Sequence, residues 1–240
     1  MTLSADAIRE IVSIQRPERI DIDGRPYVIK GYDPALESVA ETIECHTLSG
    51  ITDYVKTNID KAEHSDLMIH VVSHDEVDLL GALTTLFRQR EKPIESKAIT
   101  HSFKFGGWYQ LDEFIIAINS AFEPTEDLLY LQKLLGSVTQ GSAKSISDNG
   151  VTQSLNVKSG VSFVDTTTVK NPLVLQPYRT FLEVAQPASK FLFRLNKNKS
   201  EEGLPLCSLI EADGGAWKLE AISKIKGYFK NNLPEIAVVA

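Results

Sequence analysis

The chain has 240 residues, of which 42% are hydrophobic and 24% are charged, and its formal net charge is −7. A chain of this length and composition can bury a full core without metals or disulfides, as ordinary globular proteins do. The negative charge disfavours broad nucleic-acid binding, because the phosphate backbone attracts clustered Lys and Arg. It does not exclude a small local patch of basic residues.

The termini and cysteines indicate a protein of the cytoplasm without a membrane partner. No stretch approaches the roughly 20 apolar residues that span a bilayer, and the first residues lack a basic and apolar leader. The two cysteines, Cys45 and Cys207, lie in separate apolar runs. We therefore expect buried, reduced thiols rather than a disulfide.

The first thirty residues predict a helix and a hairpin. Ser4 can cap a helix from Ala5 to about Ile14, and Pro17 ends it. The pair Asp23-Gly24 predicts a hairpin across residues 19–30.

The section from 38 to 100 predicts a sheet with one helix. Strands are expected over 38–46 and 66–72, from Glu76 onward, and more weakly over 94–100. Ser49 is expected to cap a helix that runs to about Asp60. The unbroken apolar run at 66–72 predicts a strand buried on both faces. Residues 79–87 fit both the strand and the helix period, and that choice stays open.

The middle of the chain predicts an aromatic loop and two helices. The loop covers 103–109, and amphipathic helices follow over 111–122 and 127–135. Residues 142–150 are polar and rich in turn-forming types, which indicates a linker or a hairpin turn.

The stretch from Val151 to Asp213 predicts successive antiparallel strands. β-branched and aromatic residues dominate it, and five strands are expected with breaks near Gly160, Asn171, Pro187 and Gly203. Its central segment, 177–184, is expected to be a strand. A last helix over 217–231 follows, with an apolar stripe, and residues 236–239 can close the sheet.

These elements predict an α+β fold, with a mixed αβ N-terminal half and an antiparallel β-rich C-terminal half that ends in a helix. We expect one continuous domain over 1–240, with a possible subdivision into 1–140 and 150–240. On the central strand, Arg179 and Glu183 would share a face, with Arg194 on a following strand. This set predicts a structural latch between paired strands.

Several of these segments resemble a known family. The run LQPYRTFLEVAQPASKFLFRL at 175–195 is similar to the YfdQ-like family of phage and prophage proteins, a domain of unknown function. Supporting segments follow in the same order: Gly106 in its aromatic loop, 111–116, 148–151 with Gln153, and 212–215 with Trp217. The resemblance covers roughly residues 60–240. It implies a phage or prophage origin and the cytoplasm of a bacterial host, and it carries no established catalytic residues.

One constellation suggests enzymatic chemistry. Asp78 precedes Glu95-Ser96-Lys97, and a carboxylate followed by E-x-K is the metal-site pattern of a large nuclease superfamily. The i, i+2 spacing places Glu95 and Lys97 on one strand face. No second acidic ligand is obvious, and the E-x-K pattern is common in charged chains, so a charged strand face is the simpler interpretation.

Other candidate residues favour structure over chemistry. Phe103, Phe105, Trp108 and Tyr109 form an aromatic cluster that we interpret as part of the core or as the centre of a subunit contact, in preference to a platform for a ligand. His70 and His74 are four apart without a third ligand nearby, so we predict no zinc site. Four lysines make the last helix basic. We interpret them as a solvated face of the helix in preference to a patch that binds nucleic acid. We expect no cofactor.

The sequence thus favours a non-enzymatic phage or prophage accessory protein that acts by homo-oligomeric self-assembly. The first alternative is a binding module for DNA, a recombination partner or a nucleotide signal. The second alternative is a Mg-dependent, nuclease-like enzyme that uses Asp78, Glu95 and Lys97.

Overall fold

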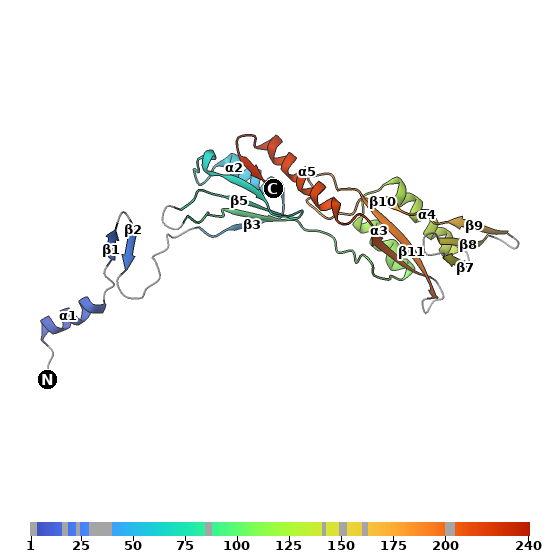
Figure 1. Ribbon diagram of the computed structural model, residues 1–240, viewed down its shortest axis with the longest axis horizontal. Helices are drawn as coiled ribbons and strands as arrows, with labels where there is room; N and C mark the ends of the chain where they lie inside the picture. Colours follow the sequence, from blue (N-terminus) through green and yellow to red (C-terminus); the bar gives the residue numbers. More distant parts are fainter. Residues whose placement is uncertain are drawn as a thin grey trace. The chain divides into compact units, whose positions relative to one another are not determined.

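The computed structural model describes residues 4–15, 19–22, 25–28, 40–84, 88–140, 143–148, 153–159, 163–199 and 205–240. The fold is α+β, as the sequence predicts (Figure 1). The chain forms two compact units, one of residues 1–41 with 82–91 and the other of residues 42–81 with 92–240. Whether the chain is one continuous domain stays a prediction.

The smaller unit contains the predicted N-terminal helix and hairpin. Helix α1 (Ala5–Gln15) begins as predicted, because Ser4 Oγ accepts a hydrogen bond from Ala7 N at 3.2 Å. Strands β1 (Arg19–Ile22) and β2 (Arg25–Val28) pair antiparallel. The predicted turn at Asp23-Gly24 lies outside the described residues.

The larger unit holds a five-stranded mixed sheet with the order β13-β4-β5-β6-β3. Its strands are β3 (Ile43–Cys45), β4 (Met68–Val71), β5 (Glu76–Leu80), β6 (Ile94–Lys97) and β13 (Ala237–Val239). The two outer pairs, β13 with β4 and β3 with β6, are parallel, and the inner pairs are antiparallel. Strand β5 ends at Leu80, within the segment 79–87 that fits both the strand and the helix period. Residues 81–84 do not continue this strand, and residues 85–87 lie outside the described part.

Helices α2 (Leu48–Thr57) and α5 (Ala216–Asn232) cover one face of this sheet. Their buried residues form one hydrophobic cluster with alternate residues of the sheet, among them Ile69, Leu79 and Ile94. The predicted stripe of the last helix is confirmed, because Trp217, Ala221, Ile225 and Phe229 are all buried. A 3-10 turn (His64–Asp66) precedes β4.

Two details of this sheet differ from the sequence prediction. Strand β4 is not buried on both faces, since Ile69 and Val71 are buried while Met68 and His70 are half-buried. Thr47, not Ser49, caps α2, and its side chain accepts from Gly50 N at 3.1 Å. The threonine is the first residue that combines an extended backbone with an oxygen in reach of the free N–H groups.

A second core joins two helices to an antiparallel sheet. Helices α3 (Leu111–Ala121) and α4 (Glu126–Gln140) pack on the sheet β10-β11-β12. The strands of that sheet are β10 (Leu173–Leu175), β11 (Ser189–Lys199) and β12 (Pro205–Glu211). A further antiparallel sheet has the order β7-β8-β9, with β7 (Ala143–Asp148), β8 (Gln153–Ser159) and β9 (Phe163–Thr168).

The β-rich stretch from 151 to 213 contains the five predicted strands, β8 to β12, and the predicted breaks fall between them. Residues 143–148 form strand β7, which pairs antiparallel with β8, so the hairpin alternative fits and the linker interpretation is wrong. Residues 149–152 lie outside the described part. A second prediction nearby was wrong. The central segment 177–184 is not a strand, because the Gln186 side chain accepts from the N–H groups of Arg179 and Thr180 and so takes the place of a partner strand.

Candidate functional site

The five-stranded sheet has one face that no described helix covers. Residues on this face alternate with the buried ones, and the register aligns His70, Asp78, Glu95 and Glu44 as one row across β4, β5, β6 and β3. A second row pairs Glu76 with Lys97. We call this the open face, and its charged residues form the candidate site.

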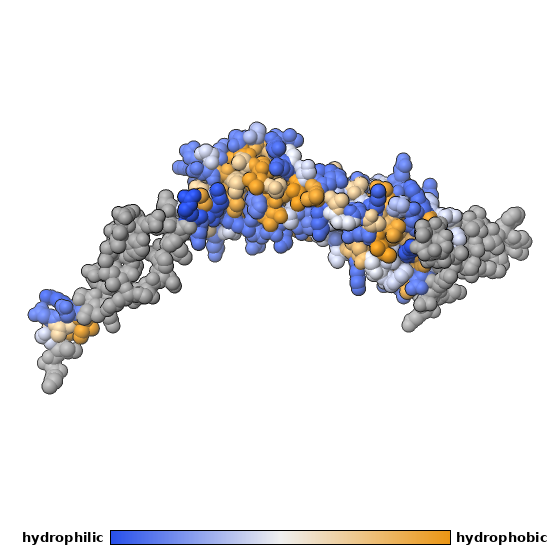
Figure 2. Space-filling model, viewed as in Figure 1, coloured by the Kyte–Doolittle hydropathy of each residue, from blue (hydrophilic) through white to orange (hydrophobic). Residues whose placement is uncertain are grey.

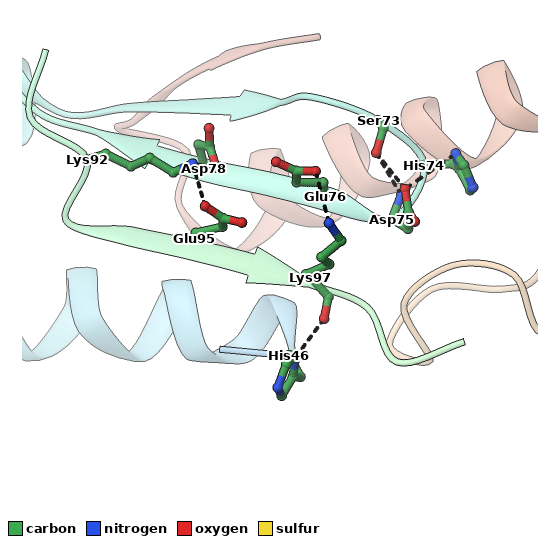
Figure 3. Close-up of polar contacts among 9 residues, drawn as sticks. All are labelled: His46, Ser73, His74, Asp75, Glu76, Asp78, Lys92, Glu95 and Lys97. Atoms are coloured by element: carbon green, nitrogen blue, oxygen red, sulfur yellow. Dashed lines mark hydrogen bonds and ion pairs between the residues drawn. The ribbon is translucent and has the colours of Figure 1, made fainter. Parts of the chain in front are cut away.

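Three carboxylates meet on the open face. Each of Glu76, Asp78 and Glu95 has a carboxylate oxygen that lies within 4.8 Å of one on each of the other two. They come from adjacent strands, β5 and β6 (Figure 3). Asp78 is 8% exposed, and its Oδ1 atom has no hydrogen-bond partner. Among the described residues, this is the one acidic or histidine group with metal-ligand geometry.

Two lysines neutralise part of this charge. Lys92 Nζ lies 2.6 Å from Glu95 Oε2 and 3.0 Å from Asp78 Oδ1, and the second contact is an ion pair without hydrogen-bond geometry. Lys97 Nζ lies 3.7 Å from Glu76 Oε2, and the Lys97 side chain is 60% exposed. Figure 3 shows the Lys92 ammonium between Asp78 and Glu95.

These contacts shift two ionisation equilibria. Burial disfavours the charged form of Lys92, but its interactions with Glu95 and Asp78 outweigh burial and raise the pKa of the ammonium. The hydrogen bond and charge of Lys92 lower the pKa of Glu95. Both groups are therefore ionised around neutral pH, and the cluster presents oxygen ligands of the kind that Mg²⁺ and Mn²⁺ prefer.

The sequence analysis identified three residues of this site and missed two. Asp78, Glu95 and Lys97 lie together as the nuclease-like pattern predicts. Glu76 was the missing second acid, and its i, i+2 spacing from Asp78 is a signal that could have found it. Lys92 could not be found in this way. It lies just before β6, whereas Asp78 lies on β5, and it reaches Asp78 only when β5 and β6 pair.

The histidines considered earlier do not complete a metal site. His70 lies in the charged row beside Asp78. His74 instead packs edge-on against Trp217, with ring centroids 4.7 Å apart, and burial lowers its pKa. In the turn before β5, the Ser73 hydroxyl donates to Asp75 Oδ1 at 2.6 Å.

Arg179 has a different set of partners from the predicted latch. Its guanidinium pairs with Glu211, hydrogen-bonds to Ser189 and stacks on Trp217, 3.7 Å from the ring centroid. Glu183 instead accepts a hydrogen bond from Ser49 N at 2.9 Å, at the start of α2. Arg194 lies on β11, paired in register with Ser208 of β12. The latch does not have the predicted geometry, because 177–184 is not a strand. Arg179 and Glu183 therefore do not share a strand face.

The aromatic loop contributes mostly to the core. Phe103, Phe105 and Tyr109 pack against the cluster of α3, α4 and the β10-β11-β12 sheet, and Phe105 stacks on Phe191 at 5.3 Å. Trp108 alone of the four is 50% exposed. Of the two cysteines, Cys207 is buried, which raises its pKa to about 12, and Cys45 is half-buried.

No family model, curated protein or solved structure matches the chain. The resemblance to the YfdQ-like family therefore stays a prediction. In the described part of the chain, no helix has the length and apolar character needed to cross a bilayer.

Proposed function

We propose that the chain is a phage or prophage accessory protein that acts by assembling with copies of itself. The observation that carries this proposal is the open face of the five-stranded sheet. All-parallel sheets are normally covered on both faces; this sheet is mixed, its two outer pairs are parallel, and the described helices cover one of its faces.

The open face has an apolar side that supports a protein contact. Met68 and Leu80 pair across β4 and β5, Ala237 lies next to Met68, and Val239 on the outer strand is 47% exposed. In Figure 2, hydrophobic residues also gather where β13 and α5 lie, on the side of the sheet that α5 covers. A second copy that covers this strip would remove apolar surface from water, which is the main driving force of association.

The test is the particle mass of the full chain by light scattering over a micromolar concentration series. We expect a mass above 26.6 kDa that increases with concentration. Val239→Lys should shift the series toward the monomer, because the interface would have to bury a charge, while edge strands tolerate lysine. Ile116→Lys is the matched control, since Ile116 is 69% exposed on α3, away from the sheet. A constant monomer mass would contradict the proposal.

A second candidate function is metal-dependent hydrolysis of a phosphodiester. Glu76 supports it, because this residue adds the second acid that the nuclease-like pattern lacked. The buried Oδ1 atom of Asp78 has no hydrogen-bond partner, and a cation bound there would displace the Lys92 ammonium that lies 3.0 Å away. A divalent cation held by the three carboxylates would activate water and orient a phosphate, and exposed Lys97 would stabilise the added negative charge.

Two measurements test the second candidate. Calorimetry with Mn²⁺ should detect binding to the chain, and Asp78→Asn should weaken it. Plasmid DNA and single-stranded substrates incubated with Mg²⁺ or Mn²⁺ should be cleaved by the original chain, and Glu95→Ala should abolish the cleavage. An activity that persists in Glu95→Ala comes from a contaminant, and the absence of both binding and cleavage rules the candidate out.

A further inference from the structure

Helix α5 carries lysines on a surface opposite to its buried stripe. Leu219, Lys226 and Lys230 are spaced by seven and four residues, which places them on one side of an α-helix. Leu219 is 73% exposed, Lys230 is exposed and Lys226 is half-buried. Lys218 is also exposed but lies on the side of the helix that carries Trp217, 5.8 Å from the centroid of its ring, and is not part of this surface. We call this surface the lysine stripe.

The open face has the opposite charge and the same order of features. Its described residues include four carboxylates and two ammonium groups. The carboxylates belong to Glu44, Glu76, Asp78 and Glu95, and the ammonium groups belong to Lys92 and Lys97. An apolar row, Met68 with Leu80, precedes the charged rows along the strands. Both surfaces therefore begin with apolar side chains and continue with charged ones.

The spacings of the two surfaces agree. Leu219 and Lys226 are separated by about 10 Å along the helix axis. Leu80 and Glu76 are four residues apart on β5, which is about 13 Å along a strand. A helix lying along the strands can therefore place Leu219 on the apolar row while Lys226 reaches the carboxylates of Asp78 and Glu76.

We propose that the lysine stripe of one copy docks on the open face of a second copy. This inference rests on the proposed self-assembly and identifies its contact. The two surfaces are different parts of the chain, so the contact is heterologous, and repetition would give a ring or a filament rather than a simple twofold dimer. The charged part of the contact also predicts that added salt weakens assembly, because salt screens exposed charges.

A charge exchange between two variants tests the contact. The first variant carries Lys226→Glu and Lys230→Glu, and the second carries Glu44→Lys and Glu76→Lys. Each variant alone should need at least about 10-fold more protein for half-assembly, since like charges would face each other. An equimolar mixture should restore assembly, because each altered surface then meets its opposite charge. Lys56→Glu with Lys133→Glu is the control, as both lysines are exposed on other helices.

The outcomes separate this inference from the proposed function. Circular dichroism and thermal melting first establish that each variant folds. If the original chain assembles and neither variant changes the particle mass, the contact is wrong and self-assembly stands. If the variants weaken assembly and the mixture does not restore it, the pairing of these two surfaces is wrong. If the original chain is a monomer throughout, both proposals fail.

Discussion

Asp127 shows how a single carboxylate can hold a helix against a strand. It lies in the first turn of α4, accepts a hydrogen bond from Val174 N of β10 at 2.7 Å, and pairs with Lys170. Burial alone would raise its pKa, but the interactions with Lys170 and Val174 outweigh burial and lower the pKa. The carboxylate therefore favours the folded state whenever it is ionised.

We expect Asp127→Asn to reduce the free energy of unfolding by about 1–3 kcal/mol near neutral pH. The stabilisation is fully present above the unfolded-state pKa of about 4 and is lost as the pH falls through the lower folded-state pKa. The difference between the two proteins in urea unfolding should therefore shrink under acid conditions. Glu126→Gln is the control, because Glu126 is exposed in the same helical turn. If both variants lose the same free energy of unfolding, the stabilisation comes from the helix dipole and not from the contacts of Asp127.

Arg179 marks the limit of prediction from sequence at this scale. The pattern around it indicated a charged residue with a structural role, and the structure gives it such a role, buried on Trp217 beside Glu211. Its partners could not be predicted, because they depend on how Gln186 folds the segment 177–184 into a loop. The alternation of polar and apolar residues in this segment predicted a strand. The hydrogen bonds from its backbone to the Gln186 side chain instead fix it as a loop.

At the scale of elements, α1 is a helix with two exposed isoleucines. Ile8 is 50% exposed and Ile11 is 48% exposed. A helix of 11 residues is marginally stable in water without packing on its apolar side. We therefore propose α1 as a second candidate contact in the assembly, alongside the lysine stripe and the open face.

We expect the pair Ile8→Asp and Ile11→Asp to reduce assembly without changing the melting of the larger unit. The acidic side chains would oppose burial of this helix face in a contact. Light scattering gives the particle mass, and circular dichroism follows the larger unit. Arg9→Ala with Glu10→Ala is the matched control, since it alters two exposed residues of the same helix and keeps its isoleucines. An unchanged particle mass would exclude α1 from the contact.

Most elements could be predicted from the sequence, and the site only in part. The helices at 5–15, 111–121 and 216–232 follow from their apolar stripes, and the first also follows from its cap, Ser4. Strand neighbours are set by long-range pairing, so the sequence could not predict that β13 lies next to β4 or that Glu76 joins Asp78 and Glu95. Lys92 was missed for the same reason.

At the scale of the molecule, the sheet depends on its last strand. Val238 of β13 pairs with Ile69 and packs against the core of the sheet. Val238→Pro replaces this packed side chain and removes its backbone N–H, and we expect it to lower the free energy of unfolding by about 0.5–3 kcal/mol. Val239→Ala is the control, since Val239 is half-exposed. Equal urea midpoints for the two variants would show that β13 contributes little.

The position of β13 also sets the order of events during synthesis. Strands β3 to β6 leave the ribosome early, and the residues that build the second core and α5 follow before β13 appears. At about 5–20 residues per second, that interval is on the order of ten seconds, during which the outer edge of β4 has no partner from its own chain. Newly made copies at high local concentration can meet in this interval. Whichever surfaces form the final contact, the edge of β4 is therefore open to a wrong partner until β13 has been made.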